Sequence, residues 1–353
     1  MLEWMPEHKW NSFNSNKALQ YRAWYDAIQK GEFLPPIEVS IDPVNDCQLN
    51  CYFCNGRDVR HRQVRMTDKH LDDLLTFFKH WGVKGICFAG GGEPTMHESL
   101  WKAFYRLHLL KIPASIITNG LFLDDEQIKF VGMYSQWIGI SVDCAHAETF
   151  KRMKGVDRFD ETIENIRKIL SVKPKEVTYK FLINSINQYE IYDAIKLAAE
   201  LGCHSIHIRP VSYKNFQKKE EDYDLYSVNN QITKGFMDYG DKLRIFAVRH
   251  KFNEKMHVQF PFKKCMATPL MPIFQADGWM TACIDRKADN SLRLCRHDGE
   301  NFNKDILKFW SSDRHKEILD KIKIEECPKC TIQHCNEIYE KVIVENRMNW
   351  EFV

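Results

Sequence analysis

The sequence has no stretch approaching the roughly 20 apolar residues that a membrane-spanning helix needs, so we expect no contact with a membrane. Its N-terminal stretch, MLEWMPEHKWNSFNSNK, also lacks the apolar core of a secretory signal peptide, which predicts a cytoplasmic protein. The formal net charge is only +2 and the basic runs are short. The overall charge therefore does not favour binding of nucleic acid.

Cysteine, by contrast, is abundant. There are 12 cysteines among 353 residues, in a chain whose 44% hydrophobic and 28% charged composition is ordinary for a globular protein. In a secreted protein these cysteines would suggest disulfides, but clustered cysteines in a cytoplasmic protein more often bind metal. The length allows one large domain and one small one.

The first cysteine cluster has the spacing C-x3-C-x2-C and consists of Cys47, Cys51 and Cys54. Four thiolates close a cube-shaped iron–sulfur cluster and suit electron transfer, whereas three leave one iron free to bind another ligand. Zinc is the alternative, but zinc sites usually pair two C-x2-C units or add histidines. The nearest histidine, His61, is awkwardly placed for that role.

This spacing, with Phe53 directly before the last cysteine, resembles the signature of the radical S-adenosylmethionine (SAM) superfamily. The resemblance implies a [4Fe-4S] cluster whose open iron binds the amino and carboxylate groups of SAM. It also implies that an electron from the cluster cleaves SAM to a 5′-deoxyadenosyl radical, which abstracts a hydrogen atom from the substrate. Such an enzyme needs a reducing partner, for example a flavodoxin or a ferredoxin.

Between about residues 37 and 209, short β-rich runs alternate with amphipathic helical patterns. The apolar residues of DKHLDDLLTFFKHW, for example, have the i, i+3, i+4 spacing of a helix with one buried face. Six strands with intervening helices predict an α/β protein with a parallel sheet, and six are fewer than the eight of a closed barrel. We therefore expect a partial (β/α)6 TIM-like barrel, the fold that the resemblance also implies.

The expected strands carry the sequences IEVSID, KGICFAGGG, PASIITNG, QWIGISVD, EVTYKFLIN and SIHIRP. The wider organisation is predicted to comprise five segments. They are an N-terminal cap (1–36) with a helix near 16–29, the barrel core (37–210), a helical bridge completing one side of the barrel (211–261), a small cysteine-rich module (262–340) and a tail (341–353).

The sequence GGGEP follows the second expected strand. Glycines after a parallel strand let the backbone approach a ligand closely, although glycine turns are common at such places. The position, one strand after the cysteine cluster, resembles the GGEP motif of the radical SAM superfamily. The resemblance implies that Gly91, Gly92, Glu93 and Pro94 form part of the SAM site, where the backbone receives the amino group of SAM.

Further candidates for the SAM site lie at the ends of later strands, because ligands of parallel sheets gather at the carboxyl ends of strands. By resemblance, we expect Ser141, Asp143 and Arg209 to contact the ribose and carboxylate of SAM, with Arg152 as another candidate for the carboxylate. Asn119 ends the third strand at the same rim. The alternative for each of these residues is a helix cap or a surface ion pair.

The second group of cysteines resembles the SPASM and Twitch modules, which hold auxiliary iron–sulfur clusters. A full SPASM module has seven cysteines and binds two clusters, but here no cysteine follows Cys335. The spacing therefore resembles the shorter Twitch module of the radical dehydrogenase that oxidises 2-deoxy-scyllo-inosamine. Zinc is the alternative occupant. The four predicted ligands of one auxiliary [4Fe-4S] cluster are Cys265, Cys283, Cys327 and Cys330.

Some cysteines remain outside both predicted sets. Cys144 follows Asp143 at the rim and could donate a hydrogen atom to a substrate radical, although a packed thiol is the alternative. Cys295 and Cys335 could each be an alternative ligand or a hydrogen donor, as in radical epimerases. Cys87 and Cys203 are expected to be small core residues.

The functional hypothesis is a radical SAM redox enzyme that dehydrogenates or epimerises a small carbohydrate-like molecule with help from the auxiliary cluster. The lack of a recognisable peptide-binding domain favours a small molecule over the alternative, modification of a peptide or protein. The chain also lacks the C-terminal cysteine spacing and the Gly-Gly tail of the GTP-cyclising enzymes of this superfamily. A second alternative is a non-enzymatic iron–sulfur electron carrier, which would gain nothing from an open iron.

Overall fold

The structure is a computed structural model that describes Lys17 and residues 20–60, 64–211, 223–248, 256 and 258–345. Parts of the expected cap, bridge and tail, together with His61, lie outside the described residues. Among the residues described, no helix is long and apolar enough to cross a membrane.

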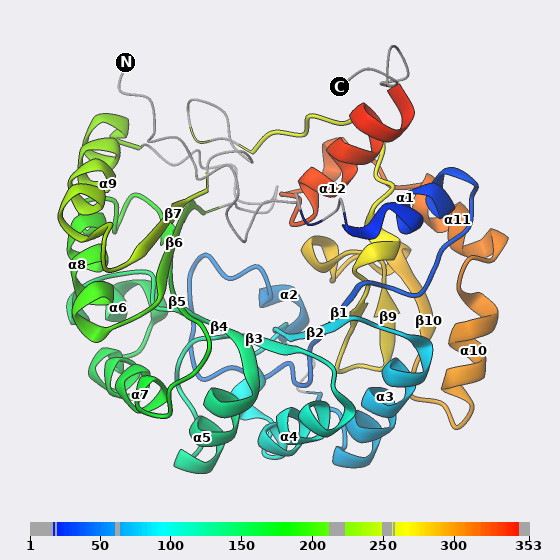
Figure 1. The fold of residues 1–353 in the computed structure, drawn as a ribbon, viewed down its shortest axis with the longest axis horizontal. Coiled ribbons are helices and arrows are strands. Elements are labelled where there is room, and N and C mark those ends of the chain that lie inside the picture. The colour runs from blue at the N-terminus through cyan, green and yellow to red at the C-terminus, as the bar shows by residue number, and fades with distance from the viewer. Residues whose placement is uncertain are drawn as a thin grey trace.

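A ten-stranded sheet forms the centre of the described structure and curls into an open barrel (Figure 1). Its order is β10-β9-β8-β1-β2-β3-β4-β5-β6-β7, and β1 to β7 run parallel. The six strands predicted from the sequence are β1 to β6, so the partial α/β barrel is confirmed. The strands are β1 (Glu38–Ile41), β2 (Gly85–Phe88), β3 (Ala114–Thr118), β4 (Ser135–Ser141), β5 (Val177–Ile183), β6 (Ser205–Pro210), β7 (Arg244–Ala247), β8 (Ile273–Phe274), β9 (Trp279–Thr281) and β10 (Arg293–Arg296).

Helices cover the outer face of the curved sheet, as Figure 1 shows for α3, α4, α5, α7 and α8. The N-terminal helix begins later than predicted, at residue 22. The described helices are α1 (Arg22–Gln29), α2 (Arg57–Arg60), α3 (Asp68–Trp81), α4 (Leu100–Leu110), α5 (Asp125–Tyr134), α6 (Ala147–Lys154), α7 (Phe159–Ser171), α8 (Ile191–Leu201), α9 (Leu225–Tyr239), α10 (Phe302–Phe309), α11 (Asp313–Asp320), α12 (Gln333–Glu337) and a π-helical segment (Ile338–Glu345).

Helix α3 shows how local sequence sets these boundaries. The side chain of Thr67 accepts a hydrogen bond from the backbone N–H of His70 and caps the start of the helix. Gly82, with a φ of 94°, ends it in the left-handed conformation that glycine adopts without strain. The apolar residues between these caps are buried against the sheet, as their helical spacing predicted.

The two faces of the barrel strands differ in exposure. On β5, Tyr179, Phe181 and Ile183 are fully buried in the core, whereas Lys180 and Leu182 between them are part-exposed. Strand β3 has the same alternation. Because successive side chains point to opposite faces, the buried set faces the helices and the part-exposed set faces the inside of the barrel. The inside is therefore accessible and includes charged residues.

The bridge differs from the prediction. It contains the expected helix, α9, but also the strand β7, which pairs in parallel with β6 and extends the barrel. We did not predict β7 because the bridge is rich in charged and aromatic residues, and we interpreted it as helical.

The cysteine-rich module is joined to the barrel by strand pairing. Strand β8 runs parallel to β1, with Ser40 opposite Ile273, and β9 and β10 continue the sheet in antiparallel order. Farther out, the indole N–H of Trp310 donates to the carbonyl oxygen of Leu34 at 3.0 Å. The predicted module is thus continuous with the barrel sheet.

Candidate functional site

The cysteine loop, which we define as residues 42–56, leaves the carboxyl end of β1 and carries three half-buried thiols, those of Cys47, Cys51 and Cys54. Two arginines of helix α2 hold its backbone from one side. Arg57 donates from Nη2 to the carbonyl oxygen of Cys51 at 3.2 Å, and Arg60 donates to that of Cys47 at 3.3 Å. The chain itself therefore stabilises the shape of the loop.

The GGGEP motif packs directly against this loop. The backbone N–H of Glu93 donates to the carbonyl oxygen of Asp46 at 2.7 Å. A Cβ atom at Gly92 would lie 2.0 Å from that same oxygen, and a Cβ at Gly91 would lie 2.6 Å from Cγ2 of Val59. Only glycine allows so close an approach, so the two sequence motifs form one structural unit.

The side chain of Glu93 is buried and accepts hydrogen bonds from the protein. Oε1 accepts from the backbone N–H and the hydroxyl of Thr95 at 3.1 and 3.0 Å and from the hydroxyl of Thr118 at 2.7 Å, while Oε2 accepts from the N–H of Asn119 at 2.7 Å. Burial raises the pKa of Glu93, although these hydrogen bonds act in the opposite direction. Through its side chain Glu93 thus ties the segment after β2 to β3, while the contact of the motif's backbone with SAM stays a prediction. Pro94, also buried, begins a short 3-10 turn.

A buried ion pair between Asp143 and Lys154 lies beside the cysteine loop. Asp143, in a left-handed conformation with a φ of 67°, accepts from the backbone N–H of Leu182 at 2.9 Å. Lys154 donates to the carboxylate of Asp143 and to the carbonyl oxygen of Ser141, and its ammonium lies 5.2 Å from the centroid of the Phe53 ring. Burial acts to lower the pKa of Lys154, but Asp143, together with the nearby Cys51 and Cys144, raises the pKa above its usual value.

Lys154 was not singled out from the sequence, although it lies two residues from a candidate that was. Arg152, the predicted contact for the SAM carboxylate, is exposed on α6. Side chains two positions apart on a helix point in different directions. Lys154 therefore faces the inside of the protein while Arg152 faces outward. The carbonyl oxygen of Lys154 also accepts from the backbone N–H of Asn50 at 2.8 Å, which docks α6 against the cysteine loop.

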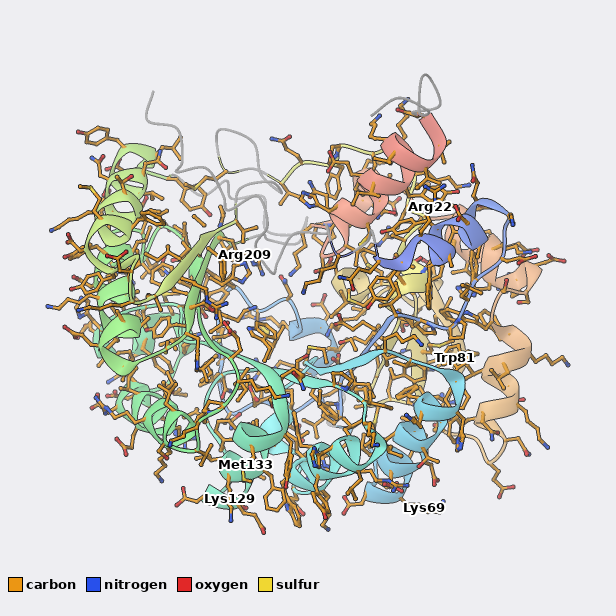
Figure 2. The ribbon with its side chains drawn as sticks, viewed as in Figure 1. Arg22, Lys69, Trp81, Lys129, Met133 and Arg209 are labelled. Atoms are coloured by element: carbon orange, nitrogen blue, oxygen red, sulfur yellow. The ribbon has the colours of Figure 1, made fainter. Side chains whose placement is uncertain are left out.

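Three other predicted residues lie at the carboxyl ends of parallel strands, the same end as the cysteine loop. Ser141 ends β4, and Arg209, which Figure 2 labels, lies near the end of β6. Both side chains are part-exposed. Asn119 follows β3, and its Nδ2 lies 3.8 Å from the sulfur of Cys47. This arrangement agrees with the expectation that strand ends share one rim.

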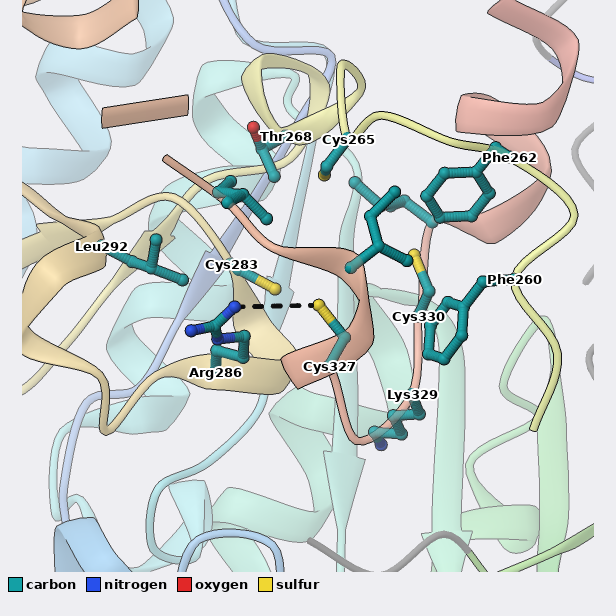
Figure 3. Close-up of a pocket in the computed structure, with 13 residues that line it drawn as sticks. Phe260, Phe262, Cys265, Thr268, Cys283, Arg286, Leu292, Cys327, Lys329 and Cys330 are labelled. Atoms are coloured by element: carbon teal, nitrogen blue, oxygen red, sulfur yellow. Dashed lines mark hydrogen bonds between the residues drawn. The ribbon is translucent and has the colours of Figure 1, made fainter. Parts of the chain in front are cut away.

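The four cysteines predicted to act together in the C-terminal module line one pocket with an empty volume of about 370 Å³ (Figure 3). Cys265 precedes β8, Cys283 follows β9, and Cys327 and Cys330 lie before α12. The fold therefore brings together thiols that are up to 65 residues apart in the sequence. Arg286 lies beside them, with Nη1 3.9 Å from the sulfur of Cys327.

Asn336, which the sequence analysis missed, supports this pocket. Its Nδ2 lies 3.7 Å from the sulfur of Cys265 and 3.8 Å from that of Cys330. Its Oδ1 accepts from the backbone N–H groups of Met266 and Ala267 at 2.7 and 2.8 Å. One buried amide thus joins two of the thiols to the backbone beside them. The only sequence signal was its position directly after the C-x4-C segment.

Comparisons with known proteins agree with this geometry. A family model described as the Radical SAM superfamily matches residues 41–183, from the cysteine loop to the end of β5. A protein of Saccharolobus solfataricus named "Probable GTP 3',8-cyclase" is 30% identical over 304 residues, covering 81% of this chain and 92% of its own length. The chain belongs to the radical SAM superfamily. A protein of the same name from Saccharolobus islandicus is 27% identical over 298 residues, with the same coverage.

Solved structures of radical SAM proteins share the fold. Streptococcus suis SuiB superimposes with a TM-score of 0.66 at 18% identity, over 91% of this chain and 77% of SuiB. The protein anSMEcpe with bound AdoMet gives a TM-score of 0.59 at 17% identity, over 84% of this chain and 89% of its own. At such low identity, the likeness supports the fold alone.

The residues of the cysteine loop fit the cluster that the radical SAM superfamily implies. Burial raises the pKa of the Cys47 thiol to about 12, so ionised sulfurs here need added positive charge, which iron ions supply. In the part of the chain that is described, no three His, Cys, Asp or Glu side chains are placed to hold a single metal ion. Three thiols on one loop are the ligand set that an open iron–sulfur cube requires.

The proposed hydrogen donors differ in their surroundings. Cys144 is fully buried in the hydrophobic core and its thiol donates to the carbonyl oxygen of Val142 at 3.6 Å, which agrees with the alternative of a packed thiol and not with an accessible donor. Cys335 lies on α12 near Tyr25, whose pKa is raised by burial and then by this thiol. Cys295 lies on β10. Roles for Cys335 and Cys295 remain predictions.

Further charged residues at the site were not singled out from the sequence. Lys287 of the module donates to the carboxylate of Asp42 at 2.7 Å and to the carbonyl oxygen of Gly90 at 2.9 Å. This buried ion pair connects the module with both the cysteine loop and the GGGEP motif. Lys180 lies on the inner face of β5. Its presence within the apolar strand VTYKFLI was a signal that could have been used.

Proposed function

We propose that this radical SAM protein is a redox enzyme that abstracts a hydrogen atom from a small, carbohydrate-like molecule and completes its dehydrogenation or epimerisation. The observation that carries the proposal is the presence of two separate thiol sets, three in the cysteine loop and four around the module pocket. Three thiolates leave one iron of a cube open, whereas four close it. Both a SAM-binding and an auxiliary [4Fe-4S] cluster would therefore be present.

SAM would be held where the parallel strands end. We assign its amino group to the backbone of Gly91 and Gly92, and its ribose and carboxylate to Ser141 and Arg209. Once bound, the cluster and SAM supply the radical chemistry that abstracts hydrogen. The contribution of the protein is to position these groups. Glu93 holds the GGGEP motif against the next strand, as its hydrogen bonds support.

The auxiliary cluster would be held by the four thiols of the module. A cluster closed by four thiolates supplies one-electron redox chemistry, which suits the removal of a second electron in a dehydrogenation. Burial raises the pKa of Cys265 to about 11, so these thiols, like those of the loop, need positive charge in order to ionise. Asn336 and Arg286 approach the sulfurs with N–H groups, and hydrogen bonds to sulfur tune the potential of such clusters.

Two other substrate classes have specific support. The SuiB structure with a TM-score of 0.67 is bound to the precursor peptide SuiA, which favours a peptide as the second candidate. The name of the curated relatives, "Probable GTP 3',8-cyclase", favours a nucleotide. Assays that follow consumption of GTP and of candidate peptides, alongside polyol and aminosugar substrates, distinguish the three classes.

The deciding experiment is the iron content and electron paramagnetic resonance of protein reconstituted without oxygen, with and without SAM. About eight irons per chain, with one signal shifted by SAM, are expected for one open and one closed four-iron cluster. About four irons would contradict the auxiliary cluster. SAM cleavage is assayed with dithionite and with a flavodoxin or ferredoxin, the proposed natural reductant. If neither reductant supports cleavage, the enzymatic function itself is contradicted.

A further inference from the structure

Basic side chains are concentrated on the inside of the barrel and at its junction with the module. Three of them belong to ion pairs: Lys154 with Asp143, Lys287 with Asp42, and Lys329 with Asp285 at 3.3 Å. Two more basic side chains, on neighbouring strands, complete the set. They are Lys180 of β5 and Arg209 of β6.

Neither Lys180 nor Arg209 has a salt-bridge partner among the described residues. The carboxylates that act on Arg209 are those of Asp285 and Asp143. Asp143 is bonded to Lys154, and Asp285 is bonded to Lys329 and also accepts from the backbone N–H of Thr331 at 2.5 Å. Among the described residues, this set inside the barrel and at its junction with the module therefore has five basic side chains, and its three carboxylates pair with three of them.

The pairing of β5 with its two neighbouring strands places Lys180 between β4 and β6. It lies opposite Ser141 of β4 on one side and opposite His207 of β6 on the other. A Cβ at Gly139 would lie 2.9 Å from Cδ of Lys180, so the stem of Lys180 uses the space that this glycine leaves open. The ammonium lies 5.5 Å from the centroid of the Trp137 ring, which supplies a cation–π contact but no negative charge.

The electrostatic surroundings disfavour a charged Lys180 in the protein alone. Partial removal from water inside the barrel lowers the pKa of Lys180 to about 7, helped by the charges of Arg209 and Lys329, while Asp143 and Cys87 act in the opposite direction. A negative group placed beside Lys180 would offset the burial and the two like charges. Its binding would therefore be accompanied by uptake of a proton near neutral pH.

We propose that Lys180 binds an anionic group of the substrate, a carboxylate or a phosphate, inside the barrel. This inference rests on the proposed function, in which the carboxylate of SAM occupies Arg209. SAM then pairs with one of the two basic side chains that lack a salt bridge, and Lys180 remains available to a second anion. The strand that carries Lys180 ends at the rim where SAM would bind, so an anion held by Lys180 directs the rest of the substrate toward SAM.

The first test measures protection of Lys180 from chemical modification. The protein is reductively methylated at pH 7 with saturating SAM, and the rate at each lysine is followed by peptide mass spectrometry. Inorganic phosphate, acetate, chloride and glycerol serve as probes, with Lys129, an exposed residue of α5, as the internal reference. Lys180 is expected to react faster than Lys129 and to be protected by phosphate or acetate but not by chloride or glycerol.

The second test uses calorimetry on SAM-loaded variants. Lys180→Met is expected to weaken binding of the protecting anion by about tenfold or more, the loss typical of one charge-assisted hydrogen bond. Lys180→Arg should retain most of the affinity, and the matched surface variant Lys129→Met should retain all of it. Proton uptake on binding, measured in buffers of different ionisation enthalpy, should disappear in Lys180→Met.

The outcomes separate the possibilities. Protection by phosphate alone assigns a phosphate ester, and protection by acetate alone assigns a carboxylate. Protection by neither anion overturns the proposal. The proposal also fails if Lys180→Met loses as much affinity for SAM as for the anion, because Lys180 would then belong to the SAM site. SAM cleavage by the wild-type protein is measured separately, so that failure of the proposed function is not confused with failure of the anion site.

Discussion

Cys51 and Cys283 belong to different thiol sets, and single substitutions can separate the two proposed clusters. Cys51→Ala is expected to abolish SAM cleavage because the loop cluster loses one of three ligands, while the iron of the module remains. Cys283→Ala is expected to do the reverse, with iron lost from the module and SAM still cleaved. The measurements are 5′-deoxyadenosine formed under dithionite and iron per chain. Unchanged SAM cleavage in Cys51→Ala would contradict the assignment of the loop.

His315 gives a prediction about pH. It is fully buried among aromatic rings, with its ring centroid 4.7 Å from those of Phe33 and Trp310. Burial lowers its pKa to about 3, whereas a histidine of the unfolded chain titrates near about 6.5. The unfolded state therefore binds a proton first, so this stabilising contribution is full above pH 6.5 and is lost as pH falls toward 3.

The predicted effect of His315→Gln is a shallower loss of stability in acid. Between pH 6 and 4, the free energy of unfolding of the wild type should fall more steeply than that of the variant by up to about 1.4 kcal/mol per pH unit, the value for one proton. Urea unfolding at several pH values measures this difference. His80→Gln, at an exposed position of α3, is the control and should follow the wild type. Parallel curves for His315→Gln and wild type would contradict the prediction.

At the scale of elements, the contact between the cysteine loop and the GGGEP motif is the feature on which the site depends. Gly92→Ala is expected to displace the loop, because the new Cβ would lie 2.0 Å from the carbonyl oxygen of Asp46. About half of the iron should be lost, together with SAM cleavage, while the module keeps its cluster. Iron analysis and electron paramagnetic resonance measure both effects.

Gly299→Ala is the matched control for that substitution. A Cβ at Gly299 meets no atom within 4 Å, so iron content and SAM cleavage should equal those of the wild type. A Gly92→Ala protein with full iron content and normal SAM cleavage would show that the loop tolerates the displacement.

Elements with strong local signals were predicted well, and those without such signals were not. Helix α3 follows from its buried stripe, its Thr67 cap and its closing glycine, all of which are local in the sequence. Strand β7 lies in a segment rich in charged and aromatic residues and becomes recognisable only by its pairing with β6. The pairing of β8 with β1 is also set by tertiary contacts, because two residues carry no periodicity.

At the scale of the whole molecule, the module covers an edge of the barrel sheet. Strand β8 pairs with β1, and β1 carries the cysteine loop at its carboxyl end. Without the module, β1 would become an unpaired edge strand, and such edges promote aggregation. The buried pair of Lys287 and Asp42 would be lost as well, leaving Asp42 without its cation.

A chain that ends at residue 261 is therefore expected to be mostly aggregated and unable to cleave SAM. Its soluble fraction and its size-exclusion profile measure this. A chain that ends at Glu345 keeps every described strand and helix and is the control, expected to behave like the full protein. A monomeric, well-folded chain ending at residue 261 would show that the barrel folds independently of the module.

The sequence by itself determined the chemistry of this protein: the three-thiol loop, the GGGEP motif, the six strands of the barrel and the four clustered thiols of the module, because each depends on spacing along the chain. Only the tertiary structure decided which charged groups face the site. Lys154 and Arg152 are equally cationic in the sequence, and packing of α6 buries one and exposes the other. Likewise, the unpaired state of Lys180 depends on which carboxylates the fold places beside other lysines. Whether two charged side chains pair depends on the distance between them, and for residues far apart in the sequence that distance is set by folding.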